Sequence, residues 1–534
     1  MTLPRALRLL LACCLAGVIV PLALGLTYTD RLATRPGYHP VTVVDHPARP
    51  DEVRRPRRAV LVVFDGLGYE EAQGMRALER VRERGQCRLT DVGSLTLSRP
   101  VYGVLSTGVD QDRGGAIINA STAPHPAESI WQIARESGLS VSVVSELPWW
   151  QELFPRGFTT TRMPPRSANY FRLAPVADLL LIHPLYIDEA GHEAGADSDA
   201  YRAAVARADG ELLEFSGTLD LDRDLLVVTS DHGHTLRGGH GARQDRVAHV
   251  LSCYAGPGVA HRTELGTLRA TSLGPSLALL LGLRFPAGMR AGDDDLDALR
   301  DLADPSAFPA GYLADRREAV ERFRAENRAQ VARWMPASEG SWEAFYEASR
   351  RPHVAAMLPF LGVLVLLLGL HWRGHRRLTK ETGGGRSGAL FGLAWMIGCG
   401  IAAHALQLGL RGSFDMSSIN NRAAFIRFTL ALGVGVGVAA LGLHLLLRRS
   451  LRALIWDLSV LSLVGTVLCL AHPASLGWHL GFPIPAPALY FFPFFTGLFL
   501  PALNGVGLIL CLLGARWRGR PEASSHGDAG HLAG

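Results

Sequence analysis

Three aliphatic runs of the sequence each end in side chains that can bind a metal ion. The runs cover residues 58–64, 179–183 and 224–230. The acids and imidazoles that follow them are Asp65, Asp188, His192, Asp231, His232 and His240. Carboxylate oxygens and imidazole nitrogens suit zinc and tolerate manganese, and one tetrahedral ion takes only four ligands. The set therefore predicts a site for two divalent ions, with zinc preferred and manganese as the alternative.

Buried parallel strands would bring these residues to one place. Continuous aliphatic runs with β-branched members are typical of strands that are covered on both faces. In open α/β sheets, ligands bind at the carboxyl ends of the strands. Three glycines within residues 233–239 would let the backbone turn tightly enough to return His240 to that edge. Taken singly, Asp65 could be a turn residue, and Asp188 with His192 a surface helix pair. Their combination favours the metal site.

The same segments resemble the metal-binding blocks of the alkaline phosphatase superfamily. The matching stretches are residues 62–67, 188–195 and 229–241. Within that superfamily, the segments most resemble those of the type I phosphodiesterase/nucleotide pyrophosphatases and the GPI ethanolamine-phosphate transferases. The resemblance covers roughly residues 58–287 and implies an α/β fold, a mostly parallel sheet sandwiched by helices. It implies one ion held by Asp188, His192 and His240, and a second held by Asp65, Asp231, His232 and the nucleophile.

The resemblance places the nucleophile at Ser98, ahead of a Thr107–Gly108 pair that closes its helix. A bare serine is a poor nucleophile at neutral pH, and a bound divalent ion lowers its pKa toward the working range. At a helix start, the hydroxyl also lies beside the positive end of the helix dipole, where a phosphate is stabilised. An ordinary helix cap before Pro100 is the alternative explanation of Ser98.

Departures from the related families narrow the substrate class. Sulfatases carry an arginine at the position of Tyr102, so sulfatase chemistry is disfavoured. The nucleotide pyrophosphatases carry an asparagine shortly after the nucleophile region, whereas the positions directly after Ser98 offer only Val101 and Tyr102. The missing asparagine counts against a nucleotide diester as the substrate. The sequence therefore predicts a phosphoesterase or phosphotransferase acting on a phosphodiester or a lipid-linked phosphate. It neither names the substrate nor separates hydrolase from transferase.

Apolar runs predict a membrane portion. The chain has 534 residues, of which 48% are hydrophobic, more than one soluble domain needs. Residues 8–26 are interpreted as a retained signal anchor, in preference to a cleaved signal peptide. Five further runs have the length of a bilayer span, at residues 353–371, 388–410, 425–447, 453–471 and 488–514. Arginines and lysines in alternate loops place both termini in the cytoplasm and the catalytic domain outside.

The chain is accordingly expected to have six parts. They are a signal anchor at 1–27, a linker at 28–57, the catalytic domain at 58–305, connecting helices at 306–352, a five-helix transmembrane domain at 353–514 and a tail at 515–534. The net charge of +5 is attributed to arginines that flank the membrane. Nucleic acid is not an expected partner, because no basic stripe alternates with aromatic residues. Membrane lipids are an expected partner.

Two other functions fit parts of the sequence. A metal-free exported domain could be a structural partner in a membrane assembly. A transporter with an accessory exported domain is the second, since His404, Gln407, His444 and Asp457 fall in or near predicted spans. Interfacial placement explains His444 and Asp457 equally well, because both lie near the cytoplasmic end of a span.

Several further residues have open roles. Arg411 and Arg422 in an expected external loop could bind an anionic lipid headgroup or simply reach the membrane interface. Cys87 and Cys253 are the two cysteines of the catalytic segment, and they could form a disulfide or be buried separately. His234 has no place in the implied ligand set, so it is expected to support a ligand or to face the substrate.

Overall fold

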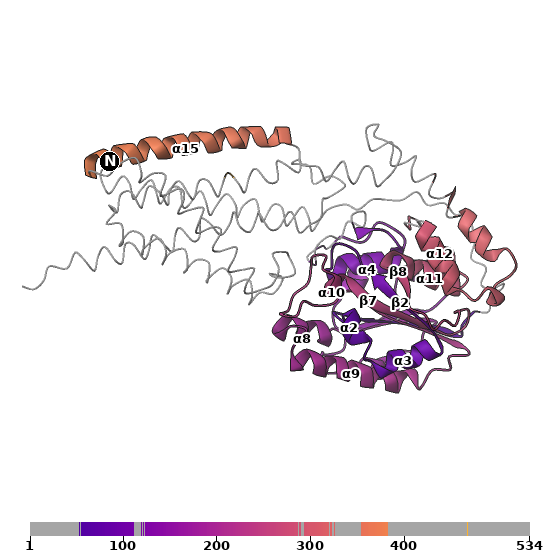
Figure 1. The fold of residues 1–534 in the computed structure, drawn as a ribbon. Coiled ribbons are helices and arrows are strands. Elements are labelled where there is room, and N and C mark those ends of the chain that lie inside the picture. Colours follow the sequence, from indigo (N-terminus) through magenta and orange to yellow (C-terminus); the bar gives the residue numbers. More distant parts are fainter. Residues whose placement is uncertain are drawn as a thin grey trace, which may run out of the picture.

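The computed structural model describes residues 53–325, with short gaps, and residues 354–382 (Figure 1). The gaps are residues 54, 112–118, 120, 122, 287, 290–292, 320 and 323–324, and Val467 is described in isolation. Helix α15 (Val354–Thr382) covers the expected span at 353–371. Among the described residues, no helix combines the length and the apolar character needed to cross a membrane. The expected signal anchor, the other four spans and the cytoplasmic tail lie outside the described residues, Val467 apart.

The described residues between 53 and 325 are built on one eight-stranded sheet with the strand order β4-β3-β5-β1-β6-β7-β2-β8. The strands are β1 (Arg58–Phe64), β2 (Gly85–Asp91), β3 (Val141–Ser145), β4 (Thr160–Arg162), β5 (Leu179–His183), β6 (Asp224–Ser230), β7 (His249–Ala255) and β8 (Gly266–Arg269). Within this sheet β7 runs antiparallel to β6 and β2, and the other pairings are parallel. The three aliphatic runs predicted as strands are β1, β5 and β6, and they are neighbours with β1 in the middle.

Helices cover both faces of the sheet, as expected (Figure 1). One layer contains α2 (Tyr69–Ala72), α3 (Arg76–Glu83), α8 (Tyr186–Ala194) and α9 (Asp199–Ser216). The other contains α4 (Ser98–Thr107), α6 (Ile130–Glu136), α11 (Leu273–Leu280) and α12 (Asp293–Leu302). Shorter helices are α7 (Trp149–Leu153), α10 (Asp245–Ala248), η1 (Phe171–Leu173), η2 (Ala270–Ser272) and η3 (Pro305–Ala307).

Strand β1 shows why the sheet needs two layers. Its side chains alternate between two hydrophobic cores, with Leu61 and Val63 in the core on the α4 side and Val62 and Phe64 in the core on the α9 side. Successive side chains of a strand point to opposite faces of the sheet. A strand with apolar side chains on both faces must therefore be covered by a layer of helices on each side. The sheet therefore holds the end of β1 rigidly inside the domain.

A disulfide joins Cys87 and Cys253. The two residues lie directly opposite each other in the antiparallel pairing of β2 with β7. The structure therefore decides between the two alternatives left by the sequence, in favour of the pair. The bond links strands on the side of β6 that is remote from β1.

Asp224 ties the start of β6 to the start of β1. Its buried carboxylate accepts hydrogen bonds from Arg57 Nε at 2.8 Å and Nη2 at 2.6 Å, and from the Asp220 backbone N–H at 3.1 Å. Burial alone would raise the pKa of Asp224, but these bonds and the nearby Arg58 hold it below its ordinary value. The ionised carboxylate therefore stabilises the fold.

We expect Asp224→Asn to lower the free energy of unfolding by about 1–3 kcal/mol at pH 7, because charged hydrogen bonds are lost. A group whose pKa is depressed by folding contributes fully above its unfolded value of 3.8, and the contribution disappears as the pH falls through the folded value. The difference between wild type and variant should therefore shrink below about pH 4. Urea unfolding at several pH values measures it, and a difference independent of pH would contradict this account.

Candidate metal centre

The seven residues predicted from the sequence lie together at the carboxyl edge of the central strands. They are Asp65 after β1, Ser98 at the start of α4, Asp188 and His192 in α8, and Asp231, His232 and His240 after β6. The short distances between them are given below. The sheet supplies the common edge because β5, β1 and β6 are parallel neighbours, so their last residues emerge side by side.

One group of the centre surrounds the ring of His232. His232 Nε2 lies 3.4 Å from Asp65 Oδ1, 3.3 Å from Asp231 Oδ2 and 3.3 Å from Ser98 Oγ. Asp65, Asp231 and His232 offer ligand atoms close enough together to hold one ion. All four side chains are buried. The hydroxyl of Ser98 therefore faces the same small space as two carboxylates and an imidazole.

Two carboxylate oxygens in this group fit a cation. Asp65 Oδ1 and Asp231 Oδ2 are buried and have no hydrogen-bond partner among the described residues. The other oxygen of Asp231 accepts hydrogen bonds from the backbone N–H of Gly66 at 3.1 Å and of His232 at 3.0 Å. Burial raises the pKa of Asp231 well above its ordinary value, and repulsion from Asp65 and Asp188 adds to this effect. A divalent ion between these oxygens would satisfy both atoms and neutralise the repulsion.

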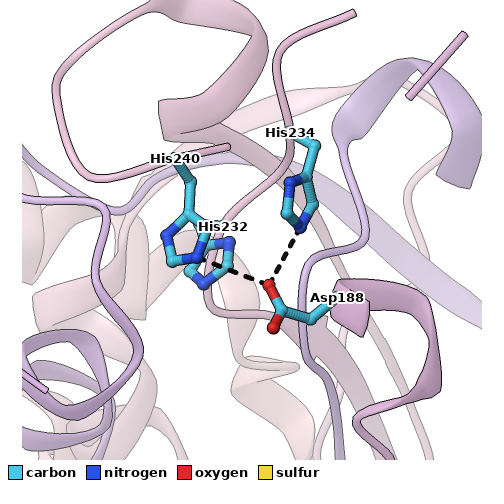
Figure 2. A group of neighbouring side chains, drawn as sticks. All are labelled: Asp188, His232, His234 and His240. Carbon is cyan, nitrogen blue, oxygen red and sulfur yellow. Dashed lines mark hydrogen bonds and ion pairs between the residues drawn. The ribbon is translucent and has the colours of Figure 1, made fainter. Parts of the chain in front are cut away.

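A second group surrounds the carboxylate of Asp188 (Figure 2). Asp188 Oδ1 lies 2.9 Å from His234 Nε2, and 3.4 Å from both His240 Nε2 and His192 Nε2. The Nε2 atoms of His192 and His240 are 2.9 Å apart. Two imidazoles and a carboxylate at these distances can converge on one ion. Asp188, His232, His234 and His240 offer ligand atoms close enough together to hold an ion, so His234 and His232 belong to this cluster, and His192, implied by the resemblance, lies beside it.

The backbone partner of each Nδ1 atom distinguishes His234 from the two histidines beside it. Nδ1 of His232 faces the carbonyl oxygen of Gly233 at 3.2 Å, and Nδ1 of His240 faces that of Thr96 at 2.5 Å. A carbonyl requires Nδ1 to carry the proton, which leaves Nε2 free to bind a metal. Nδ1 of His234 instead accepts a hydrogen bond from the Gly239 N–H at 3.3 Å. Its Nε2 therefore carries the proton and donates to Asp188.

Burial keeps the ligand-type imidazoles neutral. It lowers the pKa of His232 to about 4 and holds the pKa of His240 well below its ordinary value. The pKa of His192 is lowered as well, again mainly by burial. Metal ions bind neutral imidazole, so these side chains need not lose a proton at neutral pH before an ion can bind.

Two glycines make the close approach of these groups possible. Gly66 directly follows Asp65 and has a φ of 79°, and a Cβ atom there would lie 2.7 Å from the Cα atom of Asp188. Gly191 lies in α8, where a Cβ atom would enter the ring of His234. Glycine is the residue that tolerates both the backbone conformation and the contact. A side chain at either position would push β1 or the His234 loop away from α8.

Several residues of the centre were not predicted from the sequence. Tyr102 and His183 contact the carboxylate of Asp65, and both are buried. Thr96 holds the His240 loop: its carbonyl faces His240 Nδ1, and its hydroxyl accepts from the Gly241 N–H at 2.7 Å. Spacing along the chain gives no signal for these contacts, because they join separate elements.

Asn119 lies near the start of α4, although it is distant from Ser98 in the sequence. Its side-chain Oδ1 accepts a hydrogen bond at 3.1 Å from the backbone N–H of Arg99, the residue after Ser98. An amide therefore lies beside the start of α4, although it comes well after Ser98 in the chain. The sequence argument considered the positions directly after Ser98, and the structure adds an amide that lies near in space only.

Comparison with known proteins supports the resemblance stated above. No protein-family model matches the chain. Over 115 residues it is 35% identical to the human GPI ethanolamine phosphate transferase 3 catalytic subunit, and over 116 residues 34% identical to GPI ethanolamine phosphate transferase 3 of Schizosaccharomyces pombe. These matches cover 21% of this chain, and 10% and 12% of the two relatives respectively. The mouse catalytic subunit matches at 26% identity over 280 residues, which is 43% of this chain and 25% of that protein.

The chain thus matches a quarter or less of the length of these relatives. Among solved structures, human ectonucleotide pyrophosphatase/phosphodiesterase 5 aligns with a TM-score of 0.41 and 15% identity, over 45% of this chain and 99% of that one. Wild-type alkaline phosphatase PafA aligns with a TM-score of 0.39 and 11% identity, over 47% of this chain and 99% of that one. The predicted relation to the GPI ethanolamine-phosphate transferases is confirmed by the sequence matches.

Proposed function

We propose that this relative of the GPI ethanolamine phosphate transferases is a two-metal phosphoesterase or phosphotransferase with Ser98 as its nucleophile. The observation that carries the proposal is the pair of buried carboxylate oxygens without a hydrogen-bond partner, Asp65 Oδ1 and Asp231 Oδ2, beside the Ser98–His232 contact. Asp65, Asp231, His232 and Ser98 would hold one ion. Asp188, His192 and His240 would hold the other, with zinc as the expected metal.

The side chains of the centre have distinct tasks in this reaction. Ions bound there would stabilise the phosphoryl oxygens as Lewis acids and lower the pKa of the Ser98 hydroxyl. Ser98 Oγ would attack phosphorus, and the bond from phosphorus to the leaving oxygen would break, releasing an alcohol that takes up a proton. Water or an acceptor alcohol would then attack the phosphoserine, and Ser98 would leave and regain its proton. The positive end of the α4 dipole would favour the anionic group.

The substrate class follows from the surroundings of Ser98. Tyr102 occupies the position of the sulfatase arginine, and its hydroxyl donates to Asp65 at 2.6 Å. Tyrosine carries no positive charge, so it cannot supply the cation that an arginine would offer to a sulfate ester. Asn119 lies beside the first turn of α4, where its side-chain Oδ1 accepts a hydrogen bond from the Arg99 N–H. We therefore propose a phosphodiester or a lipid-linked phosphate as substrate, and the presence of Asn119 keeps nucleotide diesters within that class.

A membrane location is part of the proposal. Large apolar side chains of α15 are exposed, namely Leu358, Leu361, Val363, Val365, Leu366 and Leu370. Exposed apolar surface of this extent is typical of a membrane or protein contact. The Cys87–Cys253 disulfide is typical of proteins in oxidising, extracytoplasmic compartments. Both observations support an enzyme attached to a membrane with its centre on the outer side. Alkaline extraction of membranes and a protease-protection assay would test this arrangement.

Turnover of model esters tests the proposed chemistry. The purified chain should cleave bis(p-nitrophenyl) phosphate, leave p-nitrophenyl sulfate intact, and lose its activity when a chelator removes the ions. Activity should return with Zn²⁺, because the ligand set suits that ion. Incubation with phosphatidylethanolamine vesicles, with and without an acceptor alcohol, would then separate hydrolysis from transfer by product analysis. Cleavage that survives complete metal removal, measured by elemental analysis, would contradict the two-metal mechanism.

A further inference from the structure

The carboxylate of Asp65 uses its two oxygens differently. Oδ1 is the buried atom without a hydrogen-bond partner, and it faces His232. Oδ2 accepts a hydrogen bond from the hydroxyl of Tyr102 at 2.6 Å and lies 3.3 Å from His183 Nε2. A carboxylate held by one oxygen has its other oxygen fixed in direction. The partners of Oδ2 therefore decide where Oδ1 points.

The hydrogen bonds that lead to Asp65 form a series in which the donors all face the same way. Tyr102 has a single hydroxyl proton, and it goes to the carboxylate, which can only accept. His183 Nε2, 2.9 Å from the Tyr102 oxygen, must then carry the proton of that contact. The other ring nitrogen, Nδ1, is left as an acceptor for the Ser145 hydroxyl at 3.0 Å. Every donor in the chain therefore points toward Asp65.

The residues of this hydrogen-bond series are buried and closely packed. Tyr102, His183 and Ser145 are all buried. The ring of Tyr102 stacks on Trp150 at a centroid distance of 4.2 Å. The ring of His183 meets the Tyr102 ring edge-on at a centroid distance of 4.9 Å. Hydrogen bonds between buried groups are stronger than those in water. A buried polar group without a partner also costs more free energy than one in water. The Tyr102 hydroxyl thus has little freedom to turn to another partner.

We infer that Tyr102, supported by His183 and Ser145, is a positioning residue that aims Asp65 Oδ1 at the ion on the Ser98 side. This inference rests on the metal centre of the proposed function. Tyr102 lies one helical turn after Ser98 in α4. The same helix therefore presents the nucleophile and orients a ligand of the ion next to it. A shift of α4 would misplace both, so the relative position of serine and ion is set by one rigid element.

The variant Tyr102→Phe tests the inference, because it removes the hydroxyl and keeps the ring that stacks on Trp150. Zn²⁺ affinity is measured by competition with a chromophoric chelator, on the full chain after metal removal. We expect one of the two ions to bind about 10–100-fold more weakly, as is typical when a partner of a ligand is lost. The second ion, held by residues around Asp188, should keep its affinity.

Graded variants and a matched control separate positioning from general damage. His183→Gln and Ser145→Ala lie progressively further from Asp65, so their effects on the same ion should be smaller in that order. Tyr254→Phe is the control, because Tyr254 is equally buried and its hydroxyl contacts Ser276, away from the centre. It should leave both affinities unchanged. Thermal unfolding of the metal-free variants shows whether the fold itself is intact.

The outcomes are distinguishable. Equal Zn²⁺ affinities in wild type and Tyr102→Phe would overturn the positioning role and leave the proposed function standing. Loss of both ions to the same extent, with a lower unfolding temperature of the metal-free chain, would also overturn it, since that pattern indicates a purely structural role. A wild-type chain that binds no Zn²⁺ would overturn the proposed function and the inference together. Selective weakening of one ion at an unchanged unfolding temperature supports both.

Discussion

Ser98→Ala is expected to reduce turnover of a phosphodiester by about 10⁴-fold or more, the scale seen when a covalent nucleophile is removed. The variant loses a single oxygen atom, which lies 3.3 Å from His232 Nε2. The three other proposed ligands of that ion, Asp65, Asp231 and His232, are unchanged. Two ions per chain should therefore remain bound. Steady-state rates and elemental analysis on the same preparation measure the two quantities together.

Ser106→Ala is the matched control for this variant. Ser106 is a buried serine of the same helix, and its hydroxyl accepts a hydrogen bond from Trp131 Nε1 at 2.8 Å. Its loss should lower stability and leave the rate constant nearly unchanged. If Ser98→Ala keeps most of the activity with both ions bound, the covalent route is wrong. Trapping of a phosphorylated Ser98 at low pH, followed by peptide mapping, would support the covalent route.

Asp231→Asn should reduce the bound zinc from about two ions per chain toward one. Asn has nearly the same shape, so the fold can keep its packing, but it removes the negative charge from the Oδ2 atom proposed to bind the ion. Burial raises the pKa of Asp231, and repulsion from Asp65 and Asp188 adds to this effect. In the metal-free chain the variant should therefore be as stable as wild type or more stable, because it relieves that repulsion.

Asp224→Asn is the control at the other end of the same strand. Asp224 is buried to the same degree, and its partners are arginines at the opposite end of β6. It should lose stability and keep two ions, which is the reverse of the pattern expected for Asp231→Asn. Unchanged zinc content in Asp231→Asn would remove this residue from the ligand set. The remaining candidates would then have to be tested one by one.

The central strands could be predicted because their signal is local. Residues 59–63, 179–182 and 225–228 are aliphatic throughout, a pattern typical of a strand that is covered on both faces. The helix that contains Ser98 was predicted from the family resemblance, and α4 indeed begins at Ser98 and ends at Thr107, before Gly108 in a left-handed conformation. The site residues at the strand ends then followed from the rule for parallel sheets. No distance between them was available from the sequence.

The supporting residues could not be predicted, because their roles depend on tertiary contacts. Tyr102 in an apolar helix and His183 at the end of a strand have the pattern of ordinary core residues, and they meet only because β5 lies beside β1. His234 differs from His240 only through the backbone group that its Nδ1 atom faces. Asn119 bonds to Arg99, which lies 20 positions earlier in the chain, and the sequence gives no signal for this contact.

The central place of β1 also matters while the chain is being made. Among the described strands β1 is the first to leave the ribosome, yet its two neighbours, β5 and β6, come much later in the sequence. The hydrogen bond from Gly66 to Asp231 joins residues 165 positions apart. Such distant pairings form slowly, and an unpaired aliphatic strand is prone to aggregate. A nascent chain therefore has no complete centre until His240 has been synthesised, so the proposed ions could be captured only after most of the domain has emerged.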